Sequence, residues 1–185
     1  MSMTPEQFNA KFQAKIKDLE IGKVIYWAAT ATHDMMVRRI FDEGVKGDET
    51  PIGTYSTKEM YASKKQFVKG GAFAPQGKFS KKPFANGAAR KTMFLALGYK
   101  QLRDIQGRQT NKVDLTYSGD LRRDVATKLV VDGNFVLSKV SRDINQKKIA
   151  GLSAKYGNTL FKHTQEEIEF FAKNAAEDIT EYLRA

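Results

Sequence analysis

Two helix-starting motifs, one near each end of the chain, restrict the fold more than any other feature. Thr4, Pro5 and Gln7 provide a capping hydroxyl, a proline at the first helical position and an amide three residues after the cap, which together predict a capping box. Thr164 and Glu167 repeat this pattern near the C-terminus. Apolar stripes at helical spacing follow the two motifs: Phe8, Phe12, Ile16 and Leu19, and then Ile168, Phe171, Ala172, Ala175, Ile179 and Leu183. We expect the C-terminal stripe to pack on one side of a sheet.

A second N-terminal helix is predicted between two glycines. Gly22 interrupts or ends the first helix, and apolar residues then recur at helical spacing from about residue 23 to residue 43. Gly44 is a stop signal, because glycine adopts the left-handed conformation at low cost. A short helix over residues 99–105 is also predicted, with Leu102 and Ile105 facing inward.

A β-hairpin is predicted in the C-terminal half. Residues 126–131 and 135–140 are rich in β-forming residues, and Asp132-Gly133-Asn134 between them is a strong turn signal. The residues that we expect to share one buried face are Leu129, Val131, Phe135 and Leu137. Together these patterns predict an α+β fold, with long N-terminal helices and a C-terminal helix packed on a small antiparallel β-sheet.

The run from residue 113 to residue 125 predicts a joint between a strand and a helix. Residues 113–117 alternate apolar and polar side chains, as a half-buried strand does. Ser118-Gly119-Asp120 then ends the strand, and a helical spacing of apolar residues begins. The residues predicted to form this structural joint are Leu115, Gly119 and Leu121. A strained joint would need a positive φ at its glycine.

Residues 44–90 are predicted to be a long and mostly irregular segment. They contain ten glycines or prolines, and their six aromatic residues are too many for a plain flexible linker. Three interpretations stay open: a surface loop that folds its aromatics back onto the core, an extended arm that docks on a neighbouring subunit, and a segment that contacts nucleic acid. We expect one α+β domain over residues 1–185, in which residues 45–92 form an extended basic loop or arm.

The net charge of +10 is concentrated in the middle of the chain. Residues 58–113 carry a net charge of +11, whereas residues 1–57 carry −1 and residues 164–185 carry −4. Such a basic surface faces nucleic acid or an acidic neighbouring subunit. The candidate contact residues are Lys78, Phe79, Lys81, Lys82, Phe84, Arg90 and Lys91. These residue types bind phosphates and stack on bases, but a basic loop at a protein–protein contact uses them too.

Catalytic and metal-binding motifs are weak. The chain has no cysteine, which excludes disulfides, thiolate metal sites and a cysteine nucleophile. Its two histidines, His33 and His163, have no carboxylate at a metal-ligand spacing, and we expect both at surface or boundary positions. A hydrolase or magnesium site would need two of Asp114, Asp120 and Asp124 to face each other. We expect Asp120 instead to cap the turn after the joint glycine, and Asp124 to pair with an arginine.

Four sequence pieces, taken in order, carry a family resemblance. They lie at residues 38–44 with 52–56, at residues 98–103, at residues 107–121, and at residues 149–157 with Leu160-Phe161. The third piece contains a Leu-Thr-x-x-Gly-x-Leu element at residues 115–121, ahead of the predicted hairpin. In this order and spacing, the chain resembles the tail-completion and virion-morphogenesis proteins of tailed bacteriophages, particularly those of crAss-like and related Bacteroidetes phages. The resemblance excludes roughly residues 57–90.

The resemblance implies a structural protein of the virion tail or neck. Such proteins are not enzymes, need no cofactor or metal, and assemble as homo-oligomeric rings at the head–tail junction, next to other neck, tail or portal-proximal proteins. Loops and edge strands would form the contacts, and packaged DNA could face the basic segment. The first thirty residues lack a secretory signal and no apolar run is long enough to span a bilayer, so we expect synthesis in the host cytoplasm and no membrane contact. The alternative is a basic nucleic-acid-binding protein that contacts DNA through residues 58–113.

Overall fold

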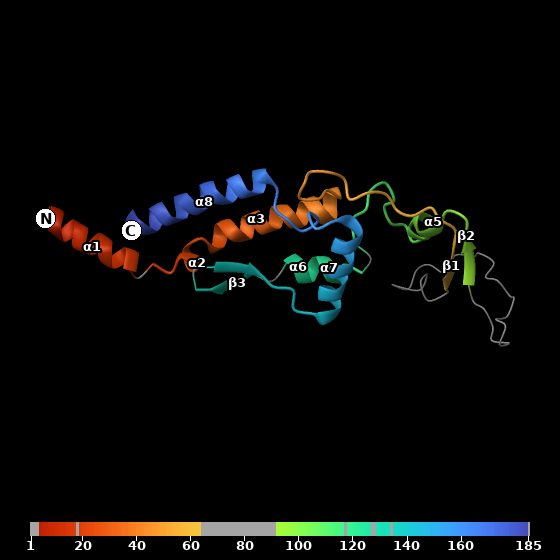
Figure 1. Cartoon of the computed structure of the whole chain (residues 1–185), viewed down its shortest axis with the longest axis horizontal. Coiled ribbons are helices and arrows are strands. Elements are labelled where there is room, and N and C mark those ends of the chain that lie inside the picture. Colours follow the sequence, from red (N-terminus) through yellow and green to blue (C-terminus); the bar gives the residue numbers. More distant parts are fainter. Residues whose placement is uncertain are drawn as a thin grey trace. The chain divides into compact units, whose positions relative to one another are not determined.

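The computed structural model describes residues 4–17, 19–63, 92–116, 118–126, 129–133 and 135–184. Its contacts divide the chain into two compact units, one formed by residues 1–52 with residues 114–185, and one formed by residues 53–113. The described residues form helices and two small antiparallel sheets (Figure 1). This is an α+β fold, which confirms the predicted class.

Helix α1 (Pro5–Lys17) begins at the predicted capping box. The Thr4 amide donates to Gln7 Oε1 at 3.0 Å, and the Gln7 amide donates to Thr4 Oγ1 at 3.3 Å. These bonds satisfy backbone donors that the start of a helix leaves without an intrahelical partner. No residue of α1 is buried, so the predicted helix forms while its apolar stripe stays largely uncovered.

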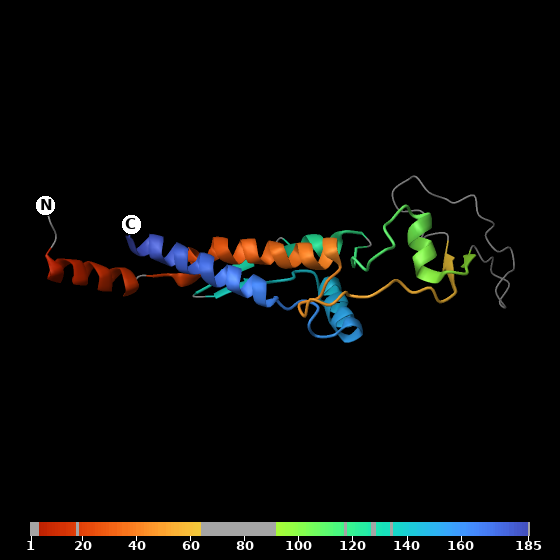
Figure 2. The same ribbon diagram turned by 90° about the horizontal axis from the view of Figure 1, so that it is seen from above.

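Helices α3 (Tyr26–Arg38) and α8 (Gln165–Arg184) lie side by side and make the most extensive helix–helix contact of the first unit (Figures 1 and 2). α3 continues into one π-helical turn, η1 (Arg39–Glu43), which ends at Gly44 with a φ of 72°. The left-handed conformation confirms the predicted glycine stop. Much of the buried apolar core comes from α3 and η1: Ala28, Met36, Val37, Ile40 and Phe41.

The short helix α2 (Ile21–Val24) connects the N-terminal helices and packs on the hairpin. Its Gly22 is buried. A Cβ atom there would meet the carbonyl oxygen of Gly133 and would lie 3.0 Å from Val131 Cγ1. Gly22 therefore marks a close approach between a helix and the hairpin backbone, in addition to the interruption that its sequence position predicts.

The predicted hairpin forms from β3 (Leu129–Asp132) and β4 (Phe135–Ser138). Its predicted buried face is wrong for Phe135 and Leu137, because Asp132 pairs with Phe135 and Val130 pairs with Leu137. Directly paired residues of an antiparallel ladder share a face, so these two apolar side chains lie on the outer face with Val130. Phe135 is 69% exposed, whereas Val136, opposite Val131, is half-buried.

Among the described residues, the joint before α6 (Asp120–Ala126) is a helix start with no strand ahead of it. Residues 113–116, the described part of the predicted strand, are not in a ladder. The Asp114 side chain accepts the Thr116 amide at 2.9 Å, and Leu115 has a φ of 51°. A local side-chain bond of this kind competes with sheet pairing, which explains why the alternating pattern fails here. Helix α7 (Asp143–Tyr156) follows the hairpin.

The second unit pairs β1 (Met60–Ser63) with β2 (Thr92–Leu95) and adds helix α5 (Gly98–Ile105). Ala62, Leu95 and Leu102 form its core. The helix confirms the prediction for residues 99–105, whereas β1 lies in the segment predicted to be mostly irregular. The unit's boundaries, 53–113, differ from the predicted insertion, 45–92, and residues 64–91 of that insertion lie outside the described part of the chain.

Candidate interaction surface

A buried ion pair joins the end of α3 to the start of α8. Arg39 donates from Nε to Glu167 Oε1 at 2.7 Å and from Nη2 to Glu167 Oε2 at 3.2 Å. Both side chains are less than one-tenth exposed. The guanidinium also donates to the carbonyl oxygens of Val45 at 3.1 Å and Lys162 at 2.7 Å. This bidentate arrangement satisfies both charges inside the unit.

Glu167 also completes the predicted capping box of α8. Its Oε2 accepts the Thr164 amide at 3.0 Å, while its own amide donates to Thr164 Oγ1 at 3.1 Å. His163 Nδ1 lies 3.1 Å from the same Oε2. Burial acts to raise the pKa of Glu167, but the bonds from Arg39 and Thr164 outweigh it and hold the pKa below its ordinary value. The carboxylate is therefore a structural acceptor that stays ionised.

Asp124 lies in a second buried polar cluster. Its carboxylate accepts hydrogen bonds from Asn145 Nδ2 at 2.9 Å, from Ser141 Oγ at 2.8 Å and from the Arg142 amide at 3.2 Å. The bond from Asn145 contributes most to holding the Asp124 pKa well below its usual range. The predicted pairing with an arginine side chain is wrong, because backbone and neutral donors at the start of α7 satisfy this carboxylate.

The predicted joint residues lie at an open groove of about 270 Å³ between the start of α6 and helix α7. Leu115, Gly119 and Leu121 all line it, and Lys148 and Gly151 lie on the α7 side. Gly119 has a φ of 78°, so the positive φ of a strained joint is confirmed. Asp120 Oδ2 accepts the Ser118 hydroxyl at 2.6 Å, and the Asp120 amide donates to Ser118 Oγ at 3.4 Å, so the predicted capping role of Asp120 stays a prediction.

The histidines lie in different environments. His33 is 3% exposed, and its Nε2 donates to the carbonyl oxygen of Val125 at 2.7 Å. The predicted surface or boundary position is therefore wrong for His33, because α3 faces α6 at this point. His163 is more exposed and lies beside Glu167, as described above. In the described part of the chain, no group of three or more histidine or acidic residues is placed to hold a metal ion.

An apolar groove of about 410 Å³ runs between α8 and the hairpin, and we name it the α8–hairpin groove. Its apolar lining comes from the α3 side, the hairpin and α8: Ile25, Ala29, Leu129, Phe135, Val136, Ile168 and Phe171. Its polar lining residues are Thr32, His33, Ser138 and His163. Ile168 is 49% exposed at its margin. The predicted contact between the C-terminal helix and the sheet thus exists across a groove rather than as closed packing.

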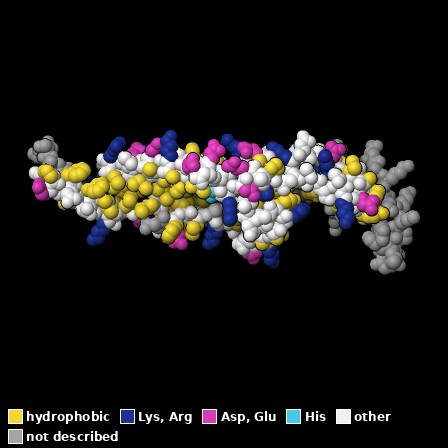
Figure 3. Space-filling model, turned by 45° about the horizontal axis from the view of Figure 1, so that its top comes forward, with side chains coloured by type: hydrophobic (Ala, Val, Ile, Leu, Met, Phe, Trp, Pro, Cys, Tyr) yellow, Lys and Arg dark blue, Asp and Glu magenta, His cyan; other side chains and the backbone are white. Residues whose placement is uncertain are grey.

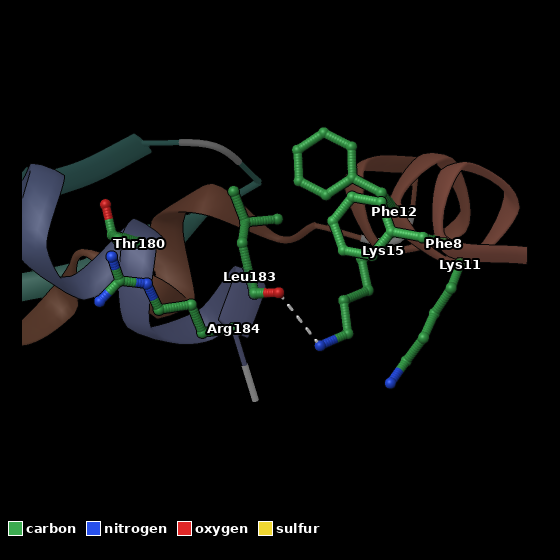
Figure 4. Close-up of a pocket in the computed structure, with 7 residues that line it drawn as sticks. All are labelled: Phe8, Lys11, Phe12, Lys15, Thr180, Leu183 and Arg184. Carbon is green, nitrogen blue, oxygen red and sulfur yellow. Dashed lines mark hydrogen bonds between the residues drawn. The ribbon is translucent and has the colours of Figure 1, made fainter. Parts of the chain in front are cut away.

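A second apolar hollow lies between α1 and the C-terminal end of α8, and we name it the α1 hollow. Its volume is about 460 Å³, and its lining includes Phe8, Phe12 and Leu183. Figure 4 shows these apolar side chains with Lys11 and Lys15 beside them; Lys15 Nζ donates to the Leu183 carbonyl oxygen at 3.4 Å. α1 therefore contacts α8 near the C-terminal end of that helix.

Hydrophobic side chains gather in one band on the face of the first unit that Figure 3 shows, from the N-terminal helix along its long helices. Several large apolar residues of the helices and the hairpin of this unit are exposed by more than a third: Phe8, Ile16, Trp27, Phe135, Ile168 and Tyr182. A contiguous band of exposed apolar side chains marks an interaction site. The sequence stripes predicted the helices but not that their apolar faces stay open.

The candidate basic contacts cannot be placed on this surface. Lys78, Phe79, Lys81, Lys82, Phe84, Arg90 and Lys91 all lie outside the described residues. In the described part of residues 44–90, Tyr55 is buried against Tyr99, with ring centroids 5.6 Å apart. Arg103 lies over the Tyr55 ring at 4.3 Å. The interpretation in which aromatics fold back thus holds for Tyr55, whereas Tyr61 pairs with Phe94 on an exposed strand face.

The site is thus an open apolar surface on an α+β unit, held in shape by two buried polar clusters. Comparison with known proteins finds no matching family model, no matching curated protein and no matching solved structure. None of the described helices is both long enough and apolar enough to cross a membrane.

Proposed function

We propose that this protein is a structural subunit of a tailed bacteriophage virion, a tail-completion or neck protein that assembles as a ring at the head–tail junction. The observation that carries the proposal is the band of exposed apolar side chains that runs from the N-terminal helix along the long helices of the first unit. A surface of this kind is stable in water when another protein surface covers it. The resemblance of the ordered sequence pieces to tail-completion proteins is the reason for proposing this particular assembly.

The strand edges support the same proposal. In the described part of the chain each sheet has two strands, so among the described residues each strand has an edge without a ladder partner, and another chain can add to such an edge. The exposed Phe135 and Leu137 on the outer hairpin face provide side-chain contacts next to such an edge. Loop and edge-strand contacts are therefore the expected mode of assembly.

Electron microscopy of the purified chain mixed with tail tubes tests this function. We expect rings of uniform diameter, free and attached to one end of the tubes. Tubes without rings at any protein concentration would contradict the proposal.

Binding of random duplex DNA separates this function from its alternative. The alternative, a DNA-binding protein acting through residues 58–113, predicts binding whose affinity falls steeply as salt increases. Such binding by a chain that forms no rings would favour the alternative. Rings without measurable DNA binding would favour the structural function.

A further inference from the structure

We propose that helix α1 of one copy docks in the α8–hairpin groove of a second copy. This rests on the proposed function, because it names the contact through which copies of a ring subunit would join. The first observation is that α1 is folded but uncovered. No residue of α1 is buried, and Phe8 and Ile16 are 62% and 45% exposed. An amphipathic helix gains most of its stability by burying its apolar face, so α1 is expected to bind an apolar groove.

The α8–hairpin groove has the character that such a helix requires. Its walls come from α3, the hairpin and α8, and its apolar lining stays open at about 410 Å³. Ile168 at its margin offers α1 an exposed aliphatic contact. Helices that lay their apolar faces into grooves use anchors spaced three or four residues apart. The α1 stripe has this spacing, at Phe8, Phe12 and Ile16.

Charge favours the same pairing. α1 contains three lysines and one glutamate. Apart from Glu167, which is buried against Arg39, α8 contains five acidic and two basic residues. Lys11 and Lys15 flank the apolar stripe of α1, and Glu169 lies next to Ile168 on α8. Opposite charges around an apolar contact speed encounter and select its orientation.

The contact has to form between copies, because α1 lies elsewhere within its own chain. α1 contacts α8 through Lys15 and Leu183 and lines the hollow beside residues 180–184. Thr180 is twelve residues from Ile168 along α8, which is about 18 Å at 1.5 Å per helical residue. A helix of one copy in the groove of the next is a head-to-tail contact, and repetition of such a contact closes rings when the rotation permits.

Cysteine cross-linking tests this contact in the full-length chain, which contains no cysteine of its own. Phe8→Cys and Ile168→Cys replace exposed side chains and should leave the fold intact. The two variants are mixed and treated with a short bismaleimide, and the product is measured on a denaturing gel. Matched controls are Ala10→Cys on the polar side of α1 and Glu177→Cys on α8, nine residues from Ile168 and so on the opposite helix face.

We expect the Phe8→Cys and Ile168→Cys mixture to give at least about tenfold more cross-linked dimer than either control pair. Yields equal to the controls would overturn the proposal. Two further results would also overturn it: dominant dimers of Phe8→Cys with itself, and a fast-migrating intrachain product when both cysteines are in one chain. If rings form while the cross-link fails, only this contact is wrong. If the chain also stays monomeric, the proposed function fails with it.

Discussion

Arg39 and Glu167 form a bidentate ion pair between the π-helical turn that ends α3 and the first turn of α8, with N–O distances of 2.7 and 3.2 Å. The two residues are 128 positions apart in the sequence. The pair therefore fixes how the two long helices meet, and with them the walls of the α8–hairpin groove. Removal of one partner would leave the other charge buried without compensation.

The first prediction concerns this pair. Glu167→Ala removes the carboxylate that Arg39 and the Thr164 amide contact, so we expect the free energy of unfolding to fall by about 3–5 kcal/mol. Glu166→Ala is the matched control, because Glu166 is an exposed acid in the same helical turn; its effect should stay within about 0.5 kcal/mol. Chemical denaturation measures both. Equal effects of the two substitutions would show that the buried pair does not hold the helices together.

The second prediction concerns the stability of the fold at low pH. The pKa values of Glu167 and Asp124 are both lowered in the folded protein, so the unfolded chain binds more protons as the pH falls. Stability is then fully present above the unfolded pKa values of about 4, and is lost as the pH falls through the lower folded values. We expect the free energy of unfolding to decrease on titration from pH 5 to pH 3. The slope should be smaller in Glu167→Gln and in Asp124→Asn, and a slope unchanged in both variants would contradict this origin.

The third prediction concerns the joint before α6. Gly119 has a φ of 78°, and nothing lies within 4 Å of a Cβ placed there. The cost of Gly119→Val is thus backbone strain rather than collision, and we expect a loss of about 1 kcal/mol or more. Gly151→Ala, at a helical position in α7 that is also open, should instead be neutral or stabilising by up to about 1 kcal/mol. Thermal unfolding compares them; unchanged stability in Gly119→Val would argue against a strained joint.

The fourth prediction concerns the contact of α2 with the hairpin. In Gly22→Ala the new methyl group would meet the carbonyl oxygens of Gly133 and Phe135. Backbone atoms cannot move aside as a flexible side chain can, so we expect a loss of about 1–3 kcal/mol. In this variant the resonances of the hairpin residues in a nuclear magnetic resonance spectrum should also shift. A substitution that stabilises the protein would mean that α2 does not approach the hairpin this closely.

Local patterns predicted the capped starts of α1 and α8, but they missed α7, the division between α2 and α3, and the long-range packing. The capping residues Thr4 and Thr164 bond as expected, because a capping box depends only on residues three positions apart. His33 and Asp124 are buried by contacts across 92 and 21 residues, and no local pattern carries that information. The predicted buried face of the hairpin was wrong by one residue in β4, because the length of the turn sets which residues pair.

The candidate site was predicted only in its parts. The apolar stripes of α1 and α8 are visible in the sequence, and so is the joint at Gly119. Whether a stripe is covered depends on the tertiary arrangement, so the open α8–hairpin groove has no sequence signal of its own. Arg39 was also missed, since an arginine inside an amphipathic helix ordinarily stays in water.

The central claim is that this chain assembles with copies of itself through its open apolar surface. Light scattering of the purified chain, alone and with tail tubes, measures this most directly. The account predicts one discrete mass that is a multiple of the chain mass, and loss of that mass when Phe8 and Ile168 are both replaced by glutamate. A monomeric mass at every concentration, alone and with tubes, would contradict it.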